Sequence, residues 1–327
     1  MKVVILGKGE MLSNLIEGVI AAGSEIVGVF RYEYTMDDKF LPIKDFFKPS
    51  NDLTLIKQYK LHQIKCKSVN SNEFKNELLR LNADVMLVGT WGERIKKEIF
   101  DIPVIASVNV HPSLLPKYRG PNPYLQNILH RETKSGITFH LINEDFDRGA
   151  ILVQKQIDIL PNDTSKELKE RTVFQARLMC AELLKKLEYG VVTPIAQKEE
   201  EATYFPNIDD NDKMLDFERE TAEEIHARIR ALHPWLPTYY TYKDKFFIPN
   251  PYKLKIINAD KGKVGEIIDT DYKNCSITVQ CKDSKALKMD GVKLYGFFNR
   301  PFTKLFIKNI SPSSVLRTPS PTQGRRV

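Results

Sequence analysis

The chain has 327 residues, of which 42% are hydrophobic and 28% are charged, so it is long enough for two globular domains of ordinary composition. No stretch approaches the run of about 18 apolar residues that a membrane-spanning helix needs, and the apolar run near the N-terminus is too short for a secretory signal. The four cysteines lack a C-x-x-C spacing, which argues against a zinc site and for free thiols. We therefore expect a cytoplasmic protein without a bound metal.

The first half of the sequence alternates short apolar runs with stretches of helical periodicity. Residues 3–6 read as a buried strand, residues 12–20 as a helix with an apolar face, and residues 26–30 as the next strand. Further helices are expected at 72–81, 93–100 and 123–130, strands at 84–88 and 103–110, an antiparallel strand pair at 136–143 and 150–159, and a long helix from Thr164 to just before Gly190. This alternation predicts an open, Rossmann-like α/β sheet in a domain of residues 1–190.

The loop Gly7-Lys8-Gly9 after the first strand departs from a dinucleotide-binding fingerprint. Leu12 stands where the third glycine of that fingerprint belongs, and Phe30-Arg31 stands where an acidic residue would end the second strand. We therefore interpret the loop as a tight turn between strand and helix.

After residue 190 the character of the sequence changes. Residues 191–212 carry prolines and several acids and are interpreted as a linker. Thr221 and Glu224 form a capping box that opens a helix reaching about Leu232. Short strand-like runs then alternate with turns, which predicts a small, OB-like β-barrel in a C-terminal domain of residues 213–310. Residues 311–327 are rich in Ser, Pro, Thr and Arg and are expected to form a disordered tail.

The net charge of the chain is +7, and the positive excess lies at its C-terminal end. Residues 251–310 hold eleven Lys and one Arg against six acidic residues. Clustered positive charge of this kind favours a polyanionic partner. A solvated, lysine-rich surface is the alternative interpretation.

The residues with the clearest chemical pattern follow the strand at 103–110, which ends in Asn109-Val110-His111-Pro112. Asn109 and His111 are two positions apart, so both side chains leave the same face of an extended strand. In an open α/β sheet the carboxyl ends of the strands form the ligand crevice. An amide and an imidazole directed at one spot there would supply the fixed hydrogen-bond donors that an oxyanion site needs.

Two loops are expected to complete this crevice. Ser113-Leu114-Leu115-Pro116 and Tyr118-Arg119-Gly120 follow His111 and can wall a pocket. Asp147, two residues before Gly149, lies in an acidic turn that can direct a carboxylate back towards His111. Taken singly, these residues are equally typical of ordinary loops and turns.

Taken together, Asn109-x-His111, Ser113-Leu114-Leu115-Pro116, Tyr118-Arg119-Gly120 and Asp147-x-Gly149 resemble the folate-dependent formyltransferases. The resemblance runs from residue 1 to about residue 310. It implies that Asn109, His111 and Asp147 are catalytic and that Ser113, Leu114, Leu115 and Pro116 contact the folate. It also implies direct formyl transfer from 10-formyltetrahydrofolate to a primary amine, without a metal or a covalent enzyme intermediate.

The resemblance leaves two acceptors open. The basic C-terminal domain favours the methionyl amino group of initiator methionyl-tRNA, because phosphate contact needs clustered Lys and Arg. The alternative is a nucleotide-linked amino sugar, which the run Lys117-Tyr118-Arg119-Gly120-Pro121 also suits. Two departures from the tRNA-formylating branch weaken the first choice. The first loop reads Gly7-Lys8-Gly9-Glu10-Met11 instead of a G-T-P-E-F type, and residues 31–50, where that branch has a basic insertion, balance four basic against four acidic residues. A binding protein with an inert site is the remaining, non-enzymatic interpretation.

Overall fold

The computed structural model describes residues 1–32, 50–243, 245–295, 299–310 and 314–316. Most of the near-neutral segment 31–50 and of the expected disordered tail 311–327 lies outside these residues. The chain divides into two compact units. Unit 1 comprises residues 1–123, 134–158 and 169–206, and unit 2 comprises residues 124–133, 159–168 and the described part of 207–327.

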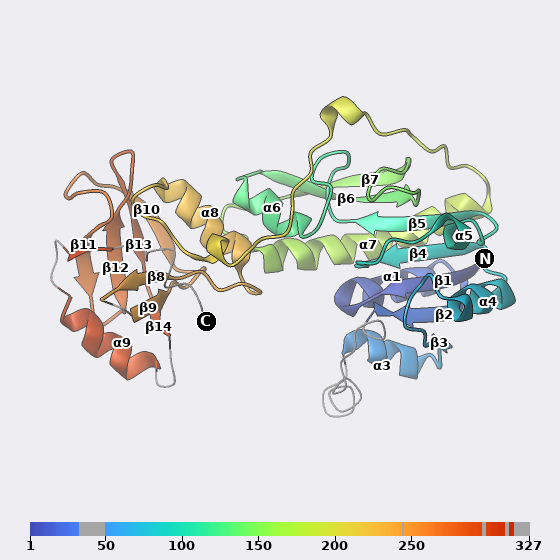
Figure 1. The fold of residues 1–327 in the computed structure, drawn as a ribbon, viewed down its shortest axis with the longest axis horizontal. Coiled ribbons are helices and arrows are strands. Elements are labelled where there is room, and N and C mark those ends of the chain that lie inside the picture. Colours follow the sequence, from blue (N-terminus) through green and yellow to red (C-terminus); the bar gives the residue numbers. More distant parts are fainter. Residues whose placement is uncertain (33–49, 244, 296–298, 311–313, 317–327) are drawn as a thin grey trace. The chain divides into compact units, whose positions relative to one another are not determined.

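Unit 1 is built on a seven-stranded sheet of order β3-β2-β1-β4-β5-β6-β7 (Figure 1). The first five strands are parallel, β6 is antiparallel to β5, and β7 is antiparallel to β6. The expected Rossmann-like sheet and its antiparallel pair are thus confirmed. The strand bounds are β1 Lys2–Gly7, β2 Glu25–Arg31, β3 Gln63–Ile64, β4 Val85–Gly89, β5 Ala106–His111, β6 Lys134–Leu141 and β7 Ile151–Asp158.

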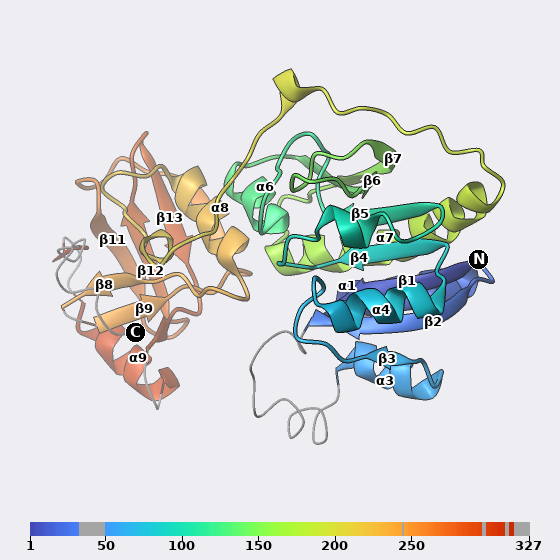
Figure 2. The same cartoon turned by 45° about the vertical axis from the view of Figure 1, so that its right-hand side comes forward.

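Helices cover both faces of this sheet, as Figures 1 and 2 show. Alternate residues of β1 face opposite ways: Val3 and Ile5 pack with α1, α3 and α7, whereas Val4 and Leu6 pack with α4 and α5. Both faces of the sheet are therefore buried from solvent, which explains why its strands are continuous apolar runs in the sequence. The helix bounds are α1 Gly9–Ala21, α3 Asn51–Gln58, α4 Asn72–Leu81, α5 Lys97–Phe100 and α7 Ser165–Glu188, of which residues 165–168 belong to unit 2.

Two of these helices show how local sequence sets the boundaries. Helix α4 matches its expected range, because the Ser71 hydroxyl caps its start and Asn82, at φ 47°, closes its end. Helix α5 begins at Lys97 and not at the expected residue 93. The reason is that the Glu93 carboxylate accepts hydrogen bonds from the Val69 N–H and the Asn70 amide, which hold residues 93–96 as a loop.

Unit 2 contains two antiparallel sheets, of order β10-β13-β12-β11-β15 and β14-β9-β8. The expected β-rich C-terminal domain is confirmed, but no hydrogen-bonded ladder joins the two sheets among the strands that the structure describes, so closure into one barrel was not observed. The strand bounds are β8 Tyr240–Tyr242, β9 Lys245–Ile248, β10 Leu254–Asn258, β11 Glu266–Asp271, β12 Ser276–Gln280, β13 Lys285–Met289, β14 Lys293–Leu294 and β15 Ser314–Val315.

Unit 2 contains the helices α6 (Pro123–Leu129), α8 (Ala222–Leu232) and α9 (Asn299–Lys308). The first residue of α6, Pro123, is assigned to unit 1. The predicted capping box of Thr221 and Glu224 is present at the start of α8. Helix α9 contradicts the expectation of strands up to residue 310. Thr303, Ile307 and Ile310 are buried at a spacing of four and three, which is a helical period within a stretch that reads as a strand.

The segment expected to be a linker has a structural role in unit 1. Ile195 exchanges backbone hydrogen bonds with Ile151, the first residue of β7, and Thr203 and Phe205 pair with Arg119. We name residues 195–205 the strap. After the strap, the chain belongs to unit 2 from residue 207 onwards. Among the described residues, no helix is both long and apolar enough to cross a membrane.

Candidate active site

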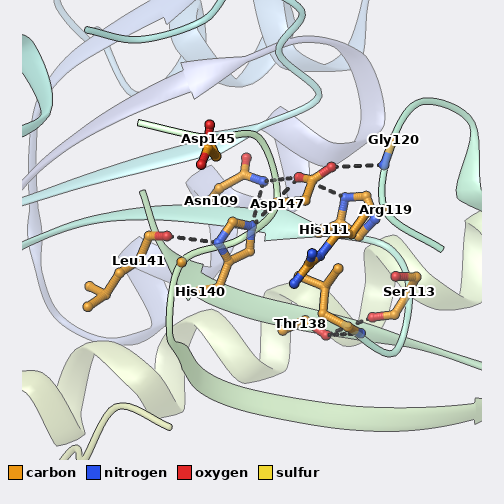
Figure 3. A network of polar contacts seen from close by, with 12 residues as sticks. Asn109, His111, Ser113, Arg119, Gly120, Thr138, His140, Leu141, Asp145 and Asp147 are labelled. Atoms are coloured by element: carbon orange, nitrogen blue, oxygen red, sulfur yellow. Dashed lines mark hydrogen bonds and ion pairs between the residues drawn. The ribbon is translucent and has the colours of Figure 1, made fainter. Parts of the chain in front are cut away.

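The side chains of Asn109, His111 and Asp147 converge at the carboxyl end of β5 (Figure 3). Asn109 and His111 leave the same face of this strand, as their spacing predicted. Asp147 lies in the turn between β6 and β7 and has a left-handed backbone, with φ of 59°. Its Oδ1 lies 3.3 Å from His111 Nδ1 and 3.5 Å from Asn109 Nδ2, and its Oδ2 accepts a hydrogen bond of 3.0 Å from the Gly120 N–H.

The surroundings of His111 favour its protonated form. Its Nε2 donates to the Tyr118 carbonyl at 2.8 Å, and its Nδ1 faces the Asp147 carboxylate, so both ring nitrogens meet acceptors. Burial by itself lowers the pKa of His111, but the charge of Asp147 and the two hydrogen bonds outweigh it and raise the pKa above its usual value. Because both ring nitrogens face acceptors of the protein in this conformation, the protonated ring would act on a substrate through its charge and not through a free N–H group.

Asp147 shows the complementary shift. Burial would raise the pKa of the Asp147 carboxyl, but the His111 charge, its hydrogen bond and the Gly120 N–H hold that pKa far below its usual range. Both shifts act in the same sense, since each partner favours the charged form of the other.

A second histidine, which the sequence analysis did not single out, orients Asn109. His140 on β6 lies directly across from Asn109 in the sheet register. Its Nδ1 donates to the Leu141 carbonyl at 2.8 Å, which leaves Nε2 as an acceptor for Asn109 Nδ2 at 3.0 Å. Burial lowers the pKa of His140 to about 4, so the ring is neutral at pH 7 and keeps this role. Only strand pairing, which is invisible in the sequence, indicates this residue.

Asn109 remains the accessible donor of the site. One N–H of its amide goes to His140, and the other points towards Asp147 Oδ1 at the long limit of a hydrogen bond. The residue is half-buried, whereas His111 and His140 are buried. A substrate oxyanion would be a better placed acceptor for the second N–H than the distant carboxylate.

The loop Ser113-Leu114-Leu115-Pro116 follows directly after His111 and is braced from within. The buried Ser113 hydroxyl donates to the Lys117 carbonyl at 2.7 Å, and the Ser113 carbonyl accepts from the Thr138 hydroxyl at 2.7 Å. Gln154 donates to the Leu115 carbonyl at 2.8 Å. Leu114 and Pro116 are half-buried and so remain open to a ligand, while Ser113 shapes the loop.

Two residues of the strap, Glu199 and Thr203, brace the loop at Tyr118 and Arg119, and the sequence analysis did not single them out. Arg119, which is 5% exposed, forms two hydrogen bonds of 2.7 and 2.8 Å to the Glu199 carboxylate. The Tyr118 N–H donates to the Thr203 hydroxyl at 2.8 Å. These contacts join loops that are about 80 positions apart in sequence, and no local pattern announces them.

The loop Gly7-Lys8-Gly9 behaves as a structural turn. The Gly9 N–H points at Asp52 Oδ2 at 3.4 Å, and the same carboxylate oxygen lies 3.2 Å from the buried Arg31 guanidinium. In a phosphate-binding loop this N–H group would point at a phosphate, whereas here it points at the Asp52 carboxylate. Among the described residues, no cluster of His, Cys, Asp and Glu is arranged to hold a metal ion.

An amide donor, an imidazole whose charged form is favoured and a carboxylate, all fixed at the carboxyl end of the sheet, are suited to acyl transfer. Donors in such a position can stabilise negative charge that develops on a carbonyl oxygen, and a carboxylate there can accept a proton from a nucleophile.

The comparisons with known proteins agree with this chemistry. The model of the formyl transferase family matches residues 1–184, and that of the formyl transferase C-terminal domain matches residues 207–296. A methionyl-tRNA formyltransferase of Clostridioides difficile is 31% identical over 273 residues, which cover 82% of this chain and 85% of the relative. One of Enterococcus faecalis is 28% identical over 298 residues, which cover 90% and 92%.

Solved structures share the fold. The N-formyltransferase from Helicobacter canadensis, in complex with folinic acid and dTDP-3-aminofucose, has a TM-score of 0.65 at 20% identity and covers 89% of this chain and 99% of its own. HypX from Aquifex aeolicus, in complex with tetrahydrofolic acid, has a TM-score of 0.59 at 15% identity and covers 91% of this chain and 45% of its own. At this identity the likeness concerns the fold alone. From the family models and the relatives, this chain belongs to the formyl transferase family and is a formyltransferase.

Proposed function

We propose that this enzyme transfers the formyl group of 10-formyltetrahydrofolate to the methionyl amino group of initiator methionyl-tRNA in the cytoplasm. The observation that carries the proposed chemistry is the convergence of Asn109, His111 and Asp147, with Asp147 Oδ1 within 3.5 Å of both other side chains. The two-domain similarity to methionyl-tRNA formyltransferases supports the acceptor.

In the proposed reaction the uncharged amine attacks the formyl carbon held on N10 of the folate. Asn109 Nδ2 donates to the oxygen that becomes negative, and the positive charge of His111 stabilises the same oxygen. As the new C–N bond forms and the bond from carbon to N10 breaks, the amine nitrogen loses a proton and N10 gains one. Asp147 accepts the proton from the amine, so the site shuttles one proton and ends unchanged.

The loop after His111 is the proposed contact for the folate. Leu114 and Pro116 are half-buried and offer apolar surface, while the buried Ser113 and Leu115 fix the loop through their backbone and, for Ser113, its hydroxyl. A braced loop loses little entropy when a ligand binds, which favours affinity.

The charge of unit 2 supports a polyanionic acceptor. Nine of its lysines between residues 253 and 308 are exposed: Lys253, Lys255, Lys261, Lys263, Lys273, Lys282, Lys293, Lys304 and Lys308. Phosphate contacts by such side chains release counterions, so binding weakens as salt rises. An interface of roughly six to ten phosphate contacts loses about 10³–10⁵ of its affinity between roughly 50 and 200 mM salt.

The alternative acceptor is a nucleotide-linked amino sugar. The loop Gly7-Lys8-Gly9-Glu10-Met11 and the balanced charge of residues 31–50 keep this acceptor open, because both depart from the tRNA-formylating branch and weaken the case for tRNA. With this acceptor the lysines of unit 2 would have no part in substrate binding.

The test measures release of tetrahydrofolate from 10-formyltetrahydrofolate. Initiator methionyl-tRNA is compared with a panel of nucleotide-linked 3-amino and 4-amino sugars. Turnover with the charged tRNA alone, with a KM that rises steeply with salt, is the expected result. Turnover with a sugar alone would establish the alternative, and folded protein without turnover on either would refute both acceptors.

A further inference from the structure

One side chain of the strap holds the turn that carries Asp147. Gln197 Nε2 donates to the Asp147 carbonyl and to the Gly149 carbonyl, each at 2.8 Å. Gln197 is half-buried although Ala196 and Lys198 beside it are exposed. A single amide group thus bridges both ends of the turn.

The other end of the same amide is fixed by Arg119. Gln197 Oε1 accepts from Arg119 Nη2 at 2.7 Å and from Arg119 Nε at 3.2 Å. Two donors and two acceptor positions of the amide are therefore all used. A flipped amide would turn its NH₂ towards the guanidinium and its oxygen towards two carbonyls, so the arrangement has one favourable orientation.

The turn needs such support because its backbone is unfavourable by itself. Asp147 has φ of 59°, a left-handed conformation that is sterically unfavourable for a residue with a Cβ. At Gly149 an added Cβ would lie 1.7 Å from the Leu141 carbonyl oxygen, so the turn packs against β6 without spare room. Left unsupported, this backbone would relax and carry the Asp147 carboxylate with it.

We propose that Gln197 is a positioning residue for formyl transfer, which holds the Asp147 turn so that the carboxylate stays between His111 and the Gly120 N–H. The role rests on the proposed function, since it concerns the same site. Gln197 touches neither reacting group and acts through Asp147. Arg119 and Glu199 fix the orientation of the Gln197 amide.

The main variant is Gln197→Met, which keeps the length of the side chain but removes both donors and the acceptor. Glu200→Met, which places the same side chain at an exposed position of the strap, is the matched control. Gln197→Glu separates the two ends of the amide, because it keeps an acceptor for Arg119 and loses both donors to the turn.

The first readout is the pKa of His111, followed through its ring Cε1 signal by NMR. The charged and titratable side chains around His111 are Asp147, His140 and Arg119. Of these, Asp147 raises the pKa of His111, as does the hydrogen bond to the Tyr118 carbonyl, and Arg119 lowers it. We expect this pKa to fall in Gln197→Met and to stay at the wild-type value in Glu200→Met. Because this measurement needs no acceptor, it remains decisive even if the proposed substrates fail, and an unchanged pKa in Gln197→Met would overturn the proposal.

The second readout is turnover. A displacement of about 1 Å in a catalytic group can cost about 10² in rate, so we expect kcat to fall by up to about 10²-fold in both Gln197 variants, while KM changes little. If Gln197→Glu has the wild-type kcat while Gln197→Met is slow, the loss of turnover comes from the lost contact with Arg119. That result would refute the positioning role. Should Gln197→Met fail to fold by circular dichroism, kcat and KM of Gln197→Glu decide the question.

Discussion

Acid is expected to destabilise unit 1 through His140. This side chain is 2% exposed, and burial, helped by the charges of His111 and Arg119, lowers its pKa from 6.5 to about 4 in spite of the opposing effect of Asp147. Once His140 is protonated, its Nε2 can no longer accept from Asn109 Nδ2, and two donors face each other. Replacing His140 by Gln keeps an acceptor but removes the titration.

The size of the effect follows from the two pKa values. Because the unfolded chain binds the His140 proton more tightly than the folded one, this contribution is complete above pH 6.5 and is lost as the pH falls towards 4. At 1.36 kcal/mol for each pH unit, the shift from 6.5 to about 4 corresponds to about 3 kcal/mol. That is a large fraction of the stability of an ordinary domain.

The assay uses the two tryptophans of the chain, Trp91 in unit 1 and Trp235 in unit 2. In a Trp235→Phe background, the fluorescence of Trp91 reports the urea unfolding of unit 1. The free energy of unfolding is compared with and without His140→Gln from pH 7.5 to pH 4. We expect the variant to gain about 3 kcal/mol relative to its parent as the pH falls. Titratable groups that both proteins share contribute equally to the two unfolding free energies and cancel in their difference. If that difference does not change with pH, the reasoning is refuted.

Three further substitutions test the site. Asn109→Ala removes the accessible donor and should lower kcat/KM by about 10²–10³ without loss of folding, measured by tetrahydrofolate release and circular dichroism; near wild-type turnover would exclude it as an oxyanion donor. Asp147→Asn removes the charge that opposes burial, so the pKa of His111 should fall below its usual value by NMR, and a pKa that stays raised would contradict the pairing. Gly149→Ala places a Cβ 1.7 Å from the Leu141 carbonyl oxygen, so both the melting temperature and kcat should fall, and a variant with wild-type values would show that the turn is free to move.

Local sequence was sufficient wherever the deciding interaction is itself local. The period of apolar residues and the capping residues Ser71 and Thr221 set the bounds of α4 and α8, because a helix is stabilised by contacts three and four positions apart. The two-residue spacing of Asn109 and His111 predicted their common direction, because side chains alternate along a strand. Local pattern failed at α9, where a buried helical face of unit 2 overrode a strand-like composition.

The sequence by itself determined the class of chemistry, because the residue types and spacing around Asn109, His111 and Asp147 identify the family. Tertiary structure alone decided how those groups are tuned. His140 meets Asn109 through strand register, and Gln197 meets Asp147 across 50 positions of sequence. Such contacts arise when the sheet and the strap close on the site, and no period along the chain encodes them. The raised pKa of His111 and the orientation of the Asn109 amide are therefore properties of the fold.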